Sequence, residues 1–387
     1  MKTQSVFLLI VCVIFITSCN TGDSARRSSQ AKLPFNIDLE RSIDNIESIQ
    51  LSTIGKKLEY IPLETDTACL LRRIENAAVG DSFIFATDGG KLFEFDKKGE
   101  FLKQIGSAGR GPGEYSRVAD FIIDEKSREI FVLSSRKVLV YGYDGHFKGE
   151  FKTDFPSNQF IMRDRNSFVF HPFNLPMGTS EPVYSWYFID RSGNVLLKLI
   201  NTLKRVNKGV IVPYSPLYMF NGTPHFMEFG VDTLYDFNNL EKKPYAIFYF
   251  GTIKMPPDPT MSEVPAINGK IWISDVKETG KSLFIKIWRD MSDSITNCIF
   301  DKASARFSVL RENGFVNDID GGVVFWPIEI PDDNTLIGYA EALDLIKLFK
   351  NDHSVNAKAN YGGKTDQLKS IAEQLNESSN PVLIVLK

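Results

Sequence analysis

The sequence predicts an all-β fold, a six-bladed β-propeller with a short α-helical C-terminal extension. Three observations carry this prediction. Short alternating strand patterns recur along the chain, the aspartates in their turns are evenly spaced, and aromatic residues are abundant, with 30 Phe and 13 Tyr among 387 residues. Aromatic side chains favour pleated, half-buried surfaces. The length alone allows several domains, but a propeller often uses well over two hundred residues as one unit.

An export signal is expected at residues 1–18. Lys2 provides a positive charge, and Val6–Ile16 is an apolar run of 11 residues. Such a run is too short for a membrane-spanning helix of about 20 residues but suits a signal peptide. It ends in Ile-Thr-Ser-Cys19, which resembles a bacterial lipobox. We therefore expect cleavage before Cys19 and a thioether bond from its thiol to diacylglycerol, with palmitate among the acyl chains. An ordinary secretory signal with a chance cysteine is the alternative.

Residues 19–49 are expected to comprise the lipidated cysteine and a flexible tether. The stretch from Asn20 to Lys32 is polar, small and Ser-rich, a composition typical of flexible linkers. Asn20 takes the place where some bacteria put an aspartate that retains lipoproteins at the inner membrane. The expected location is therefore the bacterial outer membrane, with the chain held there through its N-terminal lipid.

Residues 50–331 are expected to form the propeller. Strand pairs around an Asp/Gly turn recur in this region: Leu92–Gly106, Val138–Phe147, Trp186–Val195 and a degenerate copy at Asp232–Phe237. Their aspartates are Asp96, Asp144, Asp190 and Asp236. The steps of 48, 46 and 46 residues fit one blade of about four strands. Dividing the 281 residues from Leu51 to Pro331 by this period gives six blades.

Later blades are harder to read. Strands are expected at 271–273, 283–288 and 299–301, after an insertion around Met255–Pro259 whose prolines interrupt strand pairing. Residues 332–387 are expected to form a helical extension with a final strand. Apolar residues follow helical spacing over Leu336–Phe349 and, more weakly, over Thr365–Leu375. The last apolar run, Val382–Leu386, predicts a strand that completes a blade begun near the N-terminus.

Charge and cysteine content narrow the function. The net charge is -3, with 45 basic and 48 acidic residues. This balance does not indicate the concentrated basic face that binding of nucleic acid usually needs, so such binding is not expected. Cys69 and Cys298 are the cysteines left in the exported domain. They either form a disulfide or, in the interpretation we favour, stay as two buried thiols.

A glycine-rich loop, Ile105–Tyr115, follows the first clear repeat. It is not a phosphate-binding loop, because no Lys-Ser/Thr follows the glycines and a strand pattern comes next. Pro112-Gly113 fits the middle of a type II turn. Candidate ligand contacts lie on and just after this loop: Arg110, Glu114, Tyr115 and Arg117. In the interpretation we favour, Arg110 and Glu114 instead pair with each other or with the adjacent blade.

The segment Lys91–Phe147, with Gly-Arg-Gly-Pro-Gly-Glu-Tyr between a hairpin and the next repeat, resembles the six-bladed, NHL-like β-propeller lipoproteins of Bacteroides-type bacteria. Tyr60–Thr65 and Asn380–Ile384 are also similar to that family. The resemblance implies a propeller fold and a location in the cell envelope, and it implies no activity.

No catalytic residue, metal or cofactor is predicted. His171 and His225 are the histidines that could face a propeller channel, whereas metal sites for lyase chemistry usually need three ligands. The tryptophans form either a sugar-stacking platform or, as we favour, part of the blade cores: Trp186, Trp272, Trp288 and Trp326.

The expected function is that of a cell-envelope binding or scaffolding module for a glycan, a peptide or an envelope protein. This expectation follows from a rigid repeat architecture that carries no complete catalytic constellation. The alternative is an envelope lyase or hydrolase that acts in the propeller channel. The oligomeric state is left open.

Overall fold

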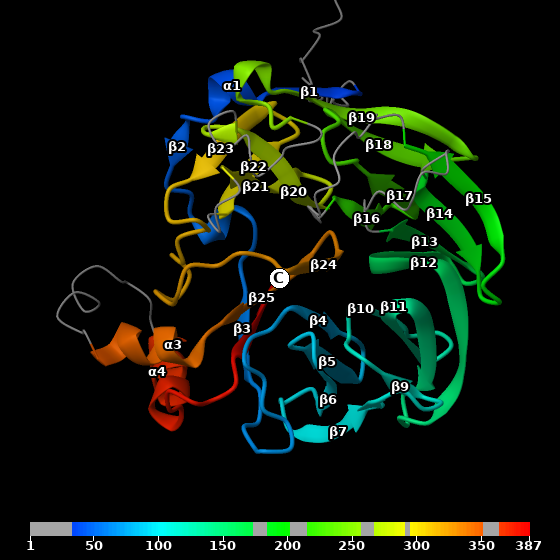
Figure 1. Cartoon of the computed structure of the whole chain (residues 1–387). Coiled ribbons are helices and arrows are strands. Elements are labelled where there is room, and N and C mark those ends of the chain that lie inside the picture. The colour runs from blue at the N-terminus through cyan, green and yellow to red at the C-terminus, as the bar shows by residue number, and fades with distance from the viewer. Residues whose placement is uncertain (1–32, 173–183, 202–214, 257–266, 291–294, 351–363) are drawn as a thin grey trace, which may run out of the picture. The chain divides into compact units, whose positions relative to one another are not determined.

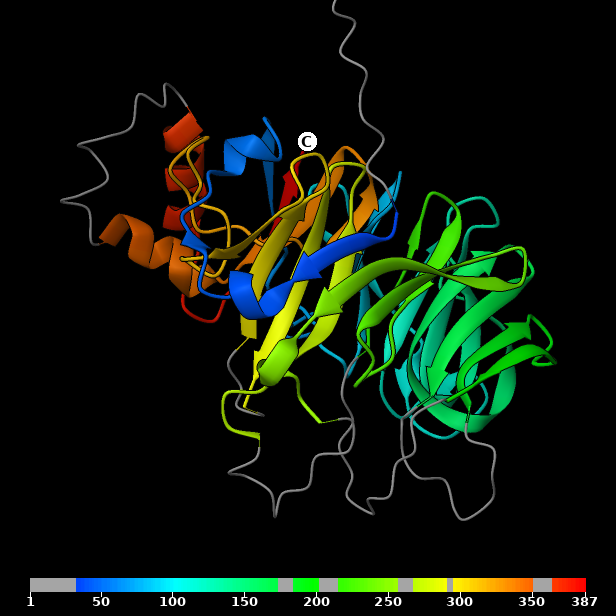
Figure 2. The same cartoon turned by 90° about the horizontal axis from the view of Figure 1, so that it is seen from above.

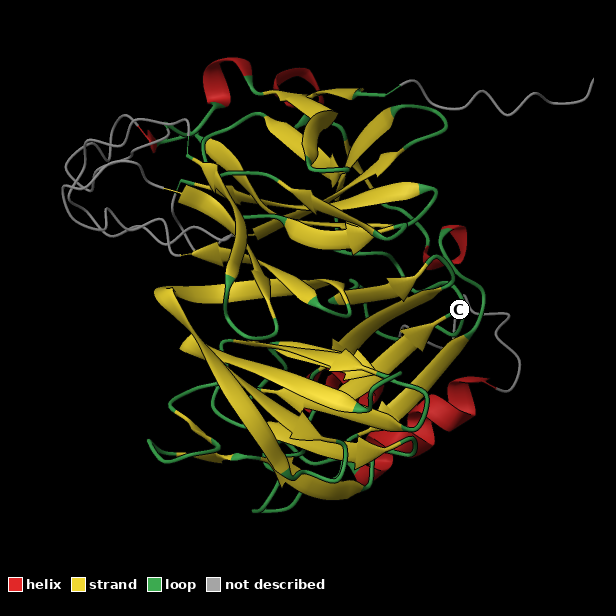
Figure 3. Cartoon of the chain, turned by 90° about the vertical axis from the view of Figure 1, so that its right-hand side faces the viewer, coloured by secondary structure: helices red, strands yellow, loops and turns green. Residues whose placement is uncertain are grey.

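The structure is a computed structural model that describes residues 33–172, 184–201, 215–256, 267–290, 295–350 and 364–387 (Figure 1). The predicted signal peptide, Cys19 and the polar stretch that follows it lie outside the described residues. The described chain is an all-β propeller with few helices, as predicted, and Figure 3 shows strands throughout it. All described residues belong to one compact unit, so the segment 33–387 contains every element of this fold.

Five sheets of four to six strands build the propeller. The first contains β4 (Asn76–Val79), β5 (Phe83–Thr87), β6 (Leu92–Asp96) and β7 (Phe101–Ile105). The second contains β10 (Asp120–Asp124), β11 (Glu129–Gly142), β12 (Phe147–Asp164), β13 (Ser167–Pro172), β14 (Tyr184–Asp190) and β15 (Val195–Ile200). The third contains β16 (Leu217–Phe220), β17 (Thr223–Phe226), β18 (Thr233–Asn238), β19 (Glu241–Tyr249) and β1 (Phe35–Asp38).

The fourth sheet contains β20 (Ile271–Glu278), β21 (Ser282–Arg289), β22 (Ile295–Asp301), β23 (Arg306–Leu310) and β2 (Ile46–Glu47). The fifth contains β24 (Glu329–Asp332), β25 (Thr335–Ala340), β26 (Val382–Leu386) and β3 (Leu58–Pro62). The pair β8 (Ser107–Ala108) and β9 (Glu114–Tyr115) lies apart from them in the glycine-rich loop. The strands expected at 271–273, 283–288 and 299–301 are parts of β20, β21 and β22.

The prediction of six blades is wrong, because two sequence repeats share the second sheet. Strands β11 and β12 are 14 and 18 residues long. The first part of β11 pairs with β10 and its second part with β12, whereas the first part of β12 pairs with β11 and its second part with β13. The ladder between β11 and β12 shifts register between Ser135 and Lys137, where Ser135 has a φ of 59°. This bulge bends the strands without breaking the sheet. A blade count based on the repeat period alone therefore gives two blades where the backbone forms one continuous sheet.

The innermost strands surround a common axis. Six of them contact one another in a closed circle: β4, β10, β12, β16, β20 and β24 (Figure 1). Five sheets supply six strands because β10 and β12 belong to the same sheet. Side chains on these strands are therefore brought together even where 40 to 50 residues separate them in the sequence, as for the hydrogen-bonded Asn76 and Asp120, 44 residues apart.

The two ends of the described chain share the fifth sheet. Strand β26 lies between β25 and β3 and pairs antiparallel with both. All five of its side chains are buried. Asn380, just before it, accepts a hydrogen bond from Leu71 N and donates to the carbonyls of Glu64 and Cys69. The last residues of the chain are thus an integral part of the sheet.

The helices are few and short: α1 (Leu39–Ser42), α3 (Ala342–Lys350), α4 (Lys364–Gln374) and the 3-10 turns η1 (Leu51–Thr53) and η2 (Gly251–Ile253). Helix α4 confirms the second predicted helix. The first prediction, Leu336–Phe349, is partly wrong because its start belongs to β25, where residues 336–340 pair with β26. Helices α3 and α4 lie side by side (Figures 1 and 2). No helix in the described ranges is long and apolar enough to cross a bilayer.

The predicted turn aspartates act through their side chains. Asp96 Oδ1 accepts hydrogen bonds from the backbone N–H groups of Lys98 and Glu100. Asp144 and Asp190 cap their own turns in the same way. Asp236 differs, since it lies inside β18 and the turn that follows begins at Asn239. These aspartates recur in the hairpins because their carboxylates accept hydrogen bonds from backbone N–H groups of the turn that have no backbone carbonyl as a partner.

The cores lie between neighbouring sheets. Cys69 and Cys298 are free, buried thiols in two different core clusters, so the favoured reading of the cysteines is confirmed. The tryptophans are also core residues, as favoured: Trp186, Trp272, Trp288 and Trp326 are all buried or half-buried against other apolar side chains. A shared sugar-stacking platform is thereby excluded, because these residues are spread over three clusters.

One buried carboxylate predicts a pH-dependent stability. Glu94 on β6 is fully buried, and neither side-chain oxygen has a hydrogen-bond partner among the described residues. Lys103 Nζ lies 3.8 Å from its Oε2. Burial raises the pKa of Glu94, and this effect outweighs the positive charges of Lys103 and Arg128, which lower the pKa. The folded state therefore holds this proton more tightly than the unfolded state, whose glutamates titrate near about pH 4.3.

Stability should accordingly fall as the pH rises from about 4.3 through the raised pKa of Glu94. The variant Glu94→Gln lacks this titration. It should match the wild type near about pH 4 and be more stable by about 1 kcal/mol near about pH 7.5, measured by urea unfolding. A variant with the same pH dependence as the wild type would show that Glu94 stays ionised in the folded protein.

Candidate functional site

Polar side chains from the innermost strands gather at the axis. We call this group the axial cluster, and it consists of Asn76, Asp120, Gln159, Lys277 and Glu329. They come from β4, β10, β12, β20 and β24, and each is partly accessible to solvent. A small number of polar groups held in fixed positions is what gives a binding site its specificity.

Asp120 ties three strands together. Its Oδ1 accepts hydrogen bonds from Asn76 Nδ2 on β4 at 2.9 Å and from Phe121 N at 2.9 Å. Its Oδ2 accepts one from Phe160 N on β12 at 3.1 Å. Burial raises the pKa of Asp120 to about 7, against these three donors, which favour the anion. The carboxyl group can therefore gain or lose a proton near neutral pH.

Lys277 supplies the positive charge of the axial cluster. Its Nζ lies 3.0 Å from Glu329 Oε2 on β24. Burial alone would lower the pKa of Lys277, but the carboxylates of Glu329, Asp275 and Asp120 raise it. The ammonium group is thus held charged at the axis with N–H donors in addition to the one that Glu329 occupies.

Gln159 provides an uncommitted acceptor. Its Nε2 donates to Leu217 O on β16 at 3.4 Å, whereas its buried Oε1 has no hydrogen-bond partner among the described residues. Together the axial cluster offers a cation, two carboxyl groups and amide groups. This mixture can hydrogen-bond to hydroxyl, amide or carboxylate groups of a polar ligand.

The glycine-rich loop is mainly structural. Gly113 has a φ of 71°, and Glu114 N donates to Gly111 O, which confirms the predicted type II turn. Glu114 does not pair with Arg110; its Oε2 accepts from Gly111 N at 2.7 Å. Tyr115 is fully buried, and its hydroxyl donates to Ile105 O. The loop is thereby fastened to its own backbone and to the core.

The two arginines of the predicted contact set are exposed. Arg110 lies on the loop and Arg117 follows it, and neither forms an ion pair with a described residue. The structure therefore separates the four predicted contacts into two that stabilise the loop, Glu114 and Tyr115, and two whose side chains face solvent.

The two candidate channel histidines lie inside the cores. His171 on β13 is 2% exposed and packs against Trp186, with ring centroids 4.6 Å apart. His225 on β17 is 3% exposed and stacks on Tyr218. Burial lowers the pKa of His225 to about 4, so its ring is neutral near pH 7. In the described ranges, no three His, Cys, Asp or Glu side chains are arranged to hold a metal ion.

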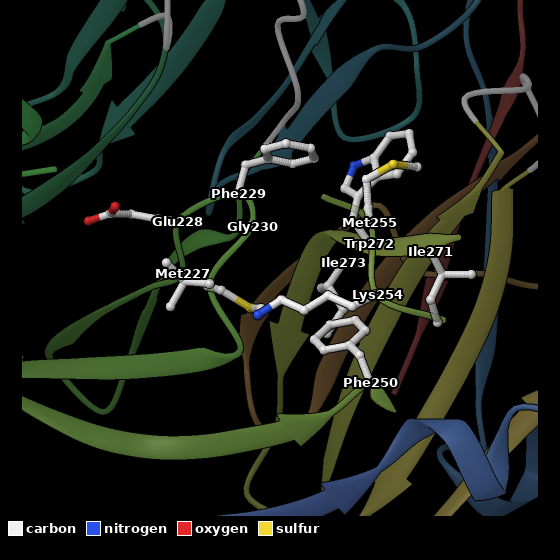
Figure 4. A pocket seen from close by; sticks show the side chains of 11 residues that line it. Met227, Glu228, Phe229, Gly230, Phe250, Lys254, Met255, Ile271, Trp272 and Ile273 are labelled. Atoms are coloured by element: carbon white, nitrogen blue, oxygen red, sulfur yellow. The ribbon is translucent and has the colours of Figure 1, made fainter. Parts of the chain in front are cut away.

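A small pocket lies beside the start of β20 (Figure 4). Its space is about 240 Å³, open solvent at its mouth included, and Phe229, Met255 and Trp272 line it. The indole N–H of Trp272 has no hydrogen-bond partner among the described residues. Most of the residues that line this space are apolar and few polar groups point to a specific ligand, so the axial cluster is the stronger candidate site.

The axial cluster was not recognisable in the sequence. Asn76, Asp120 and Glu329 each stand at the first position of an inner strand. A polar residue at a strand start is also what an ordinary turn requires. The periodic spacing of the inner strands is the signal that could have grouped these residues, but it does not place the blade boundaries between 150 and 300, where Gln159 and Lys277 lie.

Comparisons with known proteins agree with this architecture. The model of a domain of unknown function, DUF4934, matches residues 34–387. A search of curated protein sequences finds no match to the chain. The family match covers nearly all of the described residues, so it concerns the whole propeller and not one part of it.

Two solved structures show the same fold. A protein from Bacteroides fragilis, described as exported, is 17% identical, with a TM-score of 0.69 over 91% of this chain and 99% of its own. A member of the DUF4221 family from Bacteroides vulgatus is 11% identical, with a TM-score of 0.50 over 86% of this chain and 96% of its own. At these identities the likeness shows the fold alone.

Proposed function

The chain belongs to the DUF4934 family, and from that premise we propose that it is a cell-envelope lipoprotein whose NHL-like propeller binds a polar ligand, a glycan or a peptide, at its axis. The observation that carries the binding function is the axial cluster. Lys277, Glu329 and Asp120 come together there from three different strands. On the neighbouring strand β12, Gln159 Oε1 has no partner among the described residues. Rigid strands hold these groups in place, which keeps the entropy cost of binding low.

The experiment is an array of glycans and peptides probed with the segment 33–387. We expect saturable binding to at least one ligand class. The variant Lys277→Met should lose it, because a buried ammonium group that meets a polar ligand contributes about 2 kcal/mol or more. Lys281→Met, at an exposed turn residue, is the matched control and should bind as the wild type does. No saturable ligand on either array would count against the proposal.

The location in the envelope is supported by the lipobox-like Ile-Thr-Ser-Cys19 after an apolar run, and by the description of the Bacteroides fragilis structure as an exported protein. Several acyl chains on one residue give stable attachment where one alone is marginal. We propose the outer membrane as the site of attachment, since Asn20 follows the cysteine. The exposed Arg110 and Arg117 are proposed as secondary ligand contacts, with Glu114 and Tyr115 holding their loop in place.

Lipid attachment has its own test. Metabolic labelling with an alkyne fatty acid should mark the wild-type chain and leave Cys19→Ala unlabelled, because the Cys19 thiol is the acceptor for the diacylglycerol thioether. Cys69→Ala is the matched control and should label fully, since that thiol is buried in the core. Equal labelling of the wild type and Cys19→Ala would overturn the anchor.

A further inference from the structure

Two neighbouring outer hairpins expose large apolar side chains. Leu240, at the turn between β18 and β19, is 64% exposed, and Leu196 and Val195 at the start of β15 are 56% and 48% exposed. Other side chains of β15 pack against the same cluster as those of β18, which makes the hairpins adjacent. Counted outward from the axis, β14 and β15 are the third and fourth strands when β12 is the first, and β18 and β19 are the third and fourth when β16 is the first. The β14–β15 turn and the β18–β19 turn therefore lie on the same face of the propeller.

Leu240 is held in an unfavourable backbone conformation. It has a φ of 62° and follows Asn239 with a φ of 50°, a two-residue turn in which glycine or asparagine is usual. A leucine there costs backbone energy, and its exposure costs hydration energy as well. An exposed outlier of this kind points to a functional contact at the hairpin tip.

Basic side chains surround the apolar ones. Lys198 on β15 and Lys242 and Lys243 on β19 are exposed. Glu241 is the acidic residue within this stretch of β19, and its Oε2 lies 3.3 Å from Lys243 Nζ. An open hollow that includes Leu196 is lined by Arg163 and Arg165 as well as by Asp164 and Asp190. Both of those carboxylates accept backbone N–H groups of their own turns, which favours their charged form. They balance the two arginines in charge, so the excess positive charge of the two hairpins comes from the lysines.

The described chain also begins on the side of this hairpin. Strand β1 runs parallel to β19, with Phe35 opposite Ala246 and Asp38 opposite Tyr249. Going backward from Phe35 along the chain therefore leads toward Lys243 and the hairpin tip. Leu33, where the description starts, is 48% exposed. The segment that leads to Cys19 thus joins the propeller near the same apolar and basic side chains.

We propose that Leu33, Val195, Leu196 and Leu240, with Lys198, Lys242 and Lys243, form a face that docks on the anionic bilayer to which the chain is tethered. The leucines enter the interface while the lysines meet anionic headgroups. This inference rests on the lipid anchor of the proposed function. It adds that the propeller lies on the bilayer in one orientation and does not swing freely on its tether.

The test uses the unlipidated segment 33–387, so the anchor cannot produce the result. In sedimentation with vesicles, binding should be clear with about 30% phosphatidylglycerol in phosphatidylethanolamine and absent with phosphatidylcholine. The double variant Lys242→Glu with Lys243→Glu should weaken binding about tenfold or more, and Leu240→Asn about threefold or more. Leu102→Asn is the matched control, since Leu102 is 42% exposed on β7 of another sheet, and it should bind as the wild type does.

Equal sedimentation with both vesicles, or equal binding by all variants, would overturn the docking face. So would light scattering that shows a dimer dissociated by Leu196→Ser, because a second copy would then cover the face. Acyl labelling of Cys19 is independent of these outcomes, so failure of the docking face and failure of the anchor are distinguishable.

Discussion

Removal of residues 381–387 is expected to unfold the propeller. The deletion takes away β26, whose five side chains are buried, and leaves β3 and β25 without the strand between them. Burial of five such side chains contributes about 10 kcal/mol, which is comparable to the whole stability of a typical domain at about 5–15 kcal/mol. The measurement is a circular-dichroism melt of segment 33–380 beside segment 33–387, together with the soluble yield of each.

Lys387→Ala is the matched control for this deletion. The Lys387 side chain is 51% exposed, and its Nζ lies 3.5 Å from Glu59 Oε2. An exposed pair of this kind contributes at most about 1 kcal/mol, so the control should melt close to the wild type. A truncated chain that melts cooperatively within a few degrees of the wild type would show that the fifth sheet does not need β26.

Lys302→Met is expected to destabilise the protein by about 3 kcal/mol or more, because it leaves the carboxylate of Glu278 buried without its cation. Lys302 Nζ contacts Glu278 Oε1 and donates to Thr279 O at 2.5 Å. The hydroxyls of Tyr218 and Tyr245, which reach across from the third sheet, also donate to Glu278. Burial raises the pKa of Glu278 against the pull of Lys302, so the variant would be forced further toward a protonated carboxyl group.

Urea unfolding measures the loss of stability in Lys302→Met, and two further variants serve as controls. Lys281→Met, at an exposed neighbouring residue, should stay within about 0.5 kcal/mol of the wild type. The double variant Lys302→Met with Glu278→Gln should recover part of the loss, because the buried charge is gone. A loss below about 1 kcal/mol for Lys302→Met alone would show that the buried Glu278 does not depend on Lys302 for its stability.

The sequence predicted those parts of the fold that depend on local chemistry. The hairpins at Asp96, Asp144 and Asp190 were readable because each aspartate caps its own turn within four residues. The number of blades was not readable, because it depends on a register shift near Ser135 that joins two repeats into one sheet. A local bulge leaves the period of the sequence unchanged while it changes the connection of the sheets.

The candidate site was less predictable than the fold. The sequence pointed to Arg110, Glu114, Tyr115 and Arg117 because polar side chains on a glycine-rich loop are common ligand contacts. Tyr115 instead fills the core, and its hydroxyl is satisfied by Ile105 O. The axial contacts join residues far apart in the chain, such as Lys277 and Glu329, which are 52 residues apart. Only the closed circle of inner strands brings them together.

The central claim is that the axial cluster binds the ligand, and calorimetric titration tests it most directly. The probe is the glycan or peptide that binds most strongly on the arrays, added to segment 33–387 and to its Lys277→Met variant. The account predicts saturable binding by the wild type and an affinity at least about tenfold lower for the variant. Equal affinities, with both proteins equally stable, would contradict it and place the binding site away from the axis.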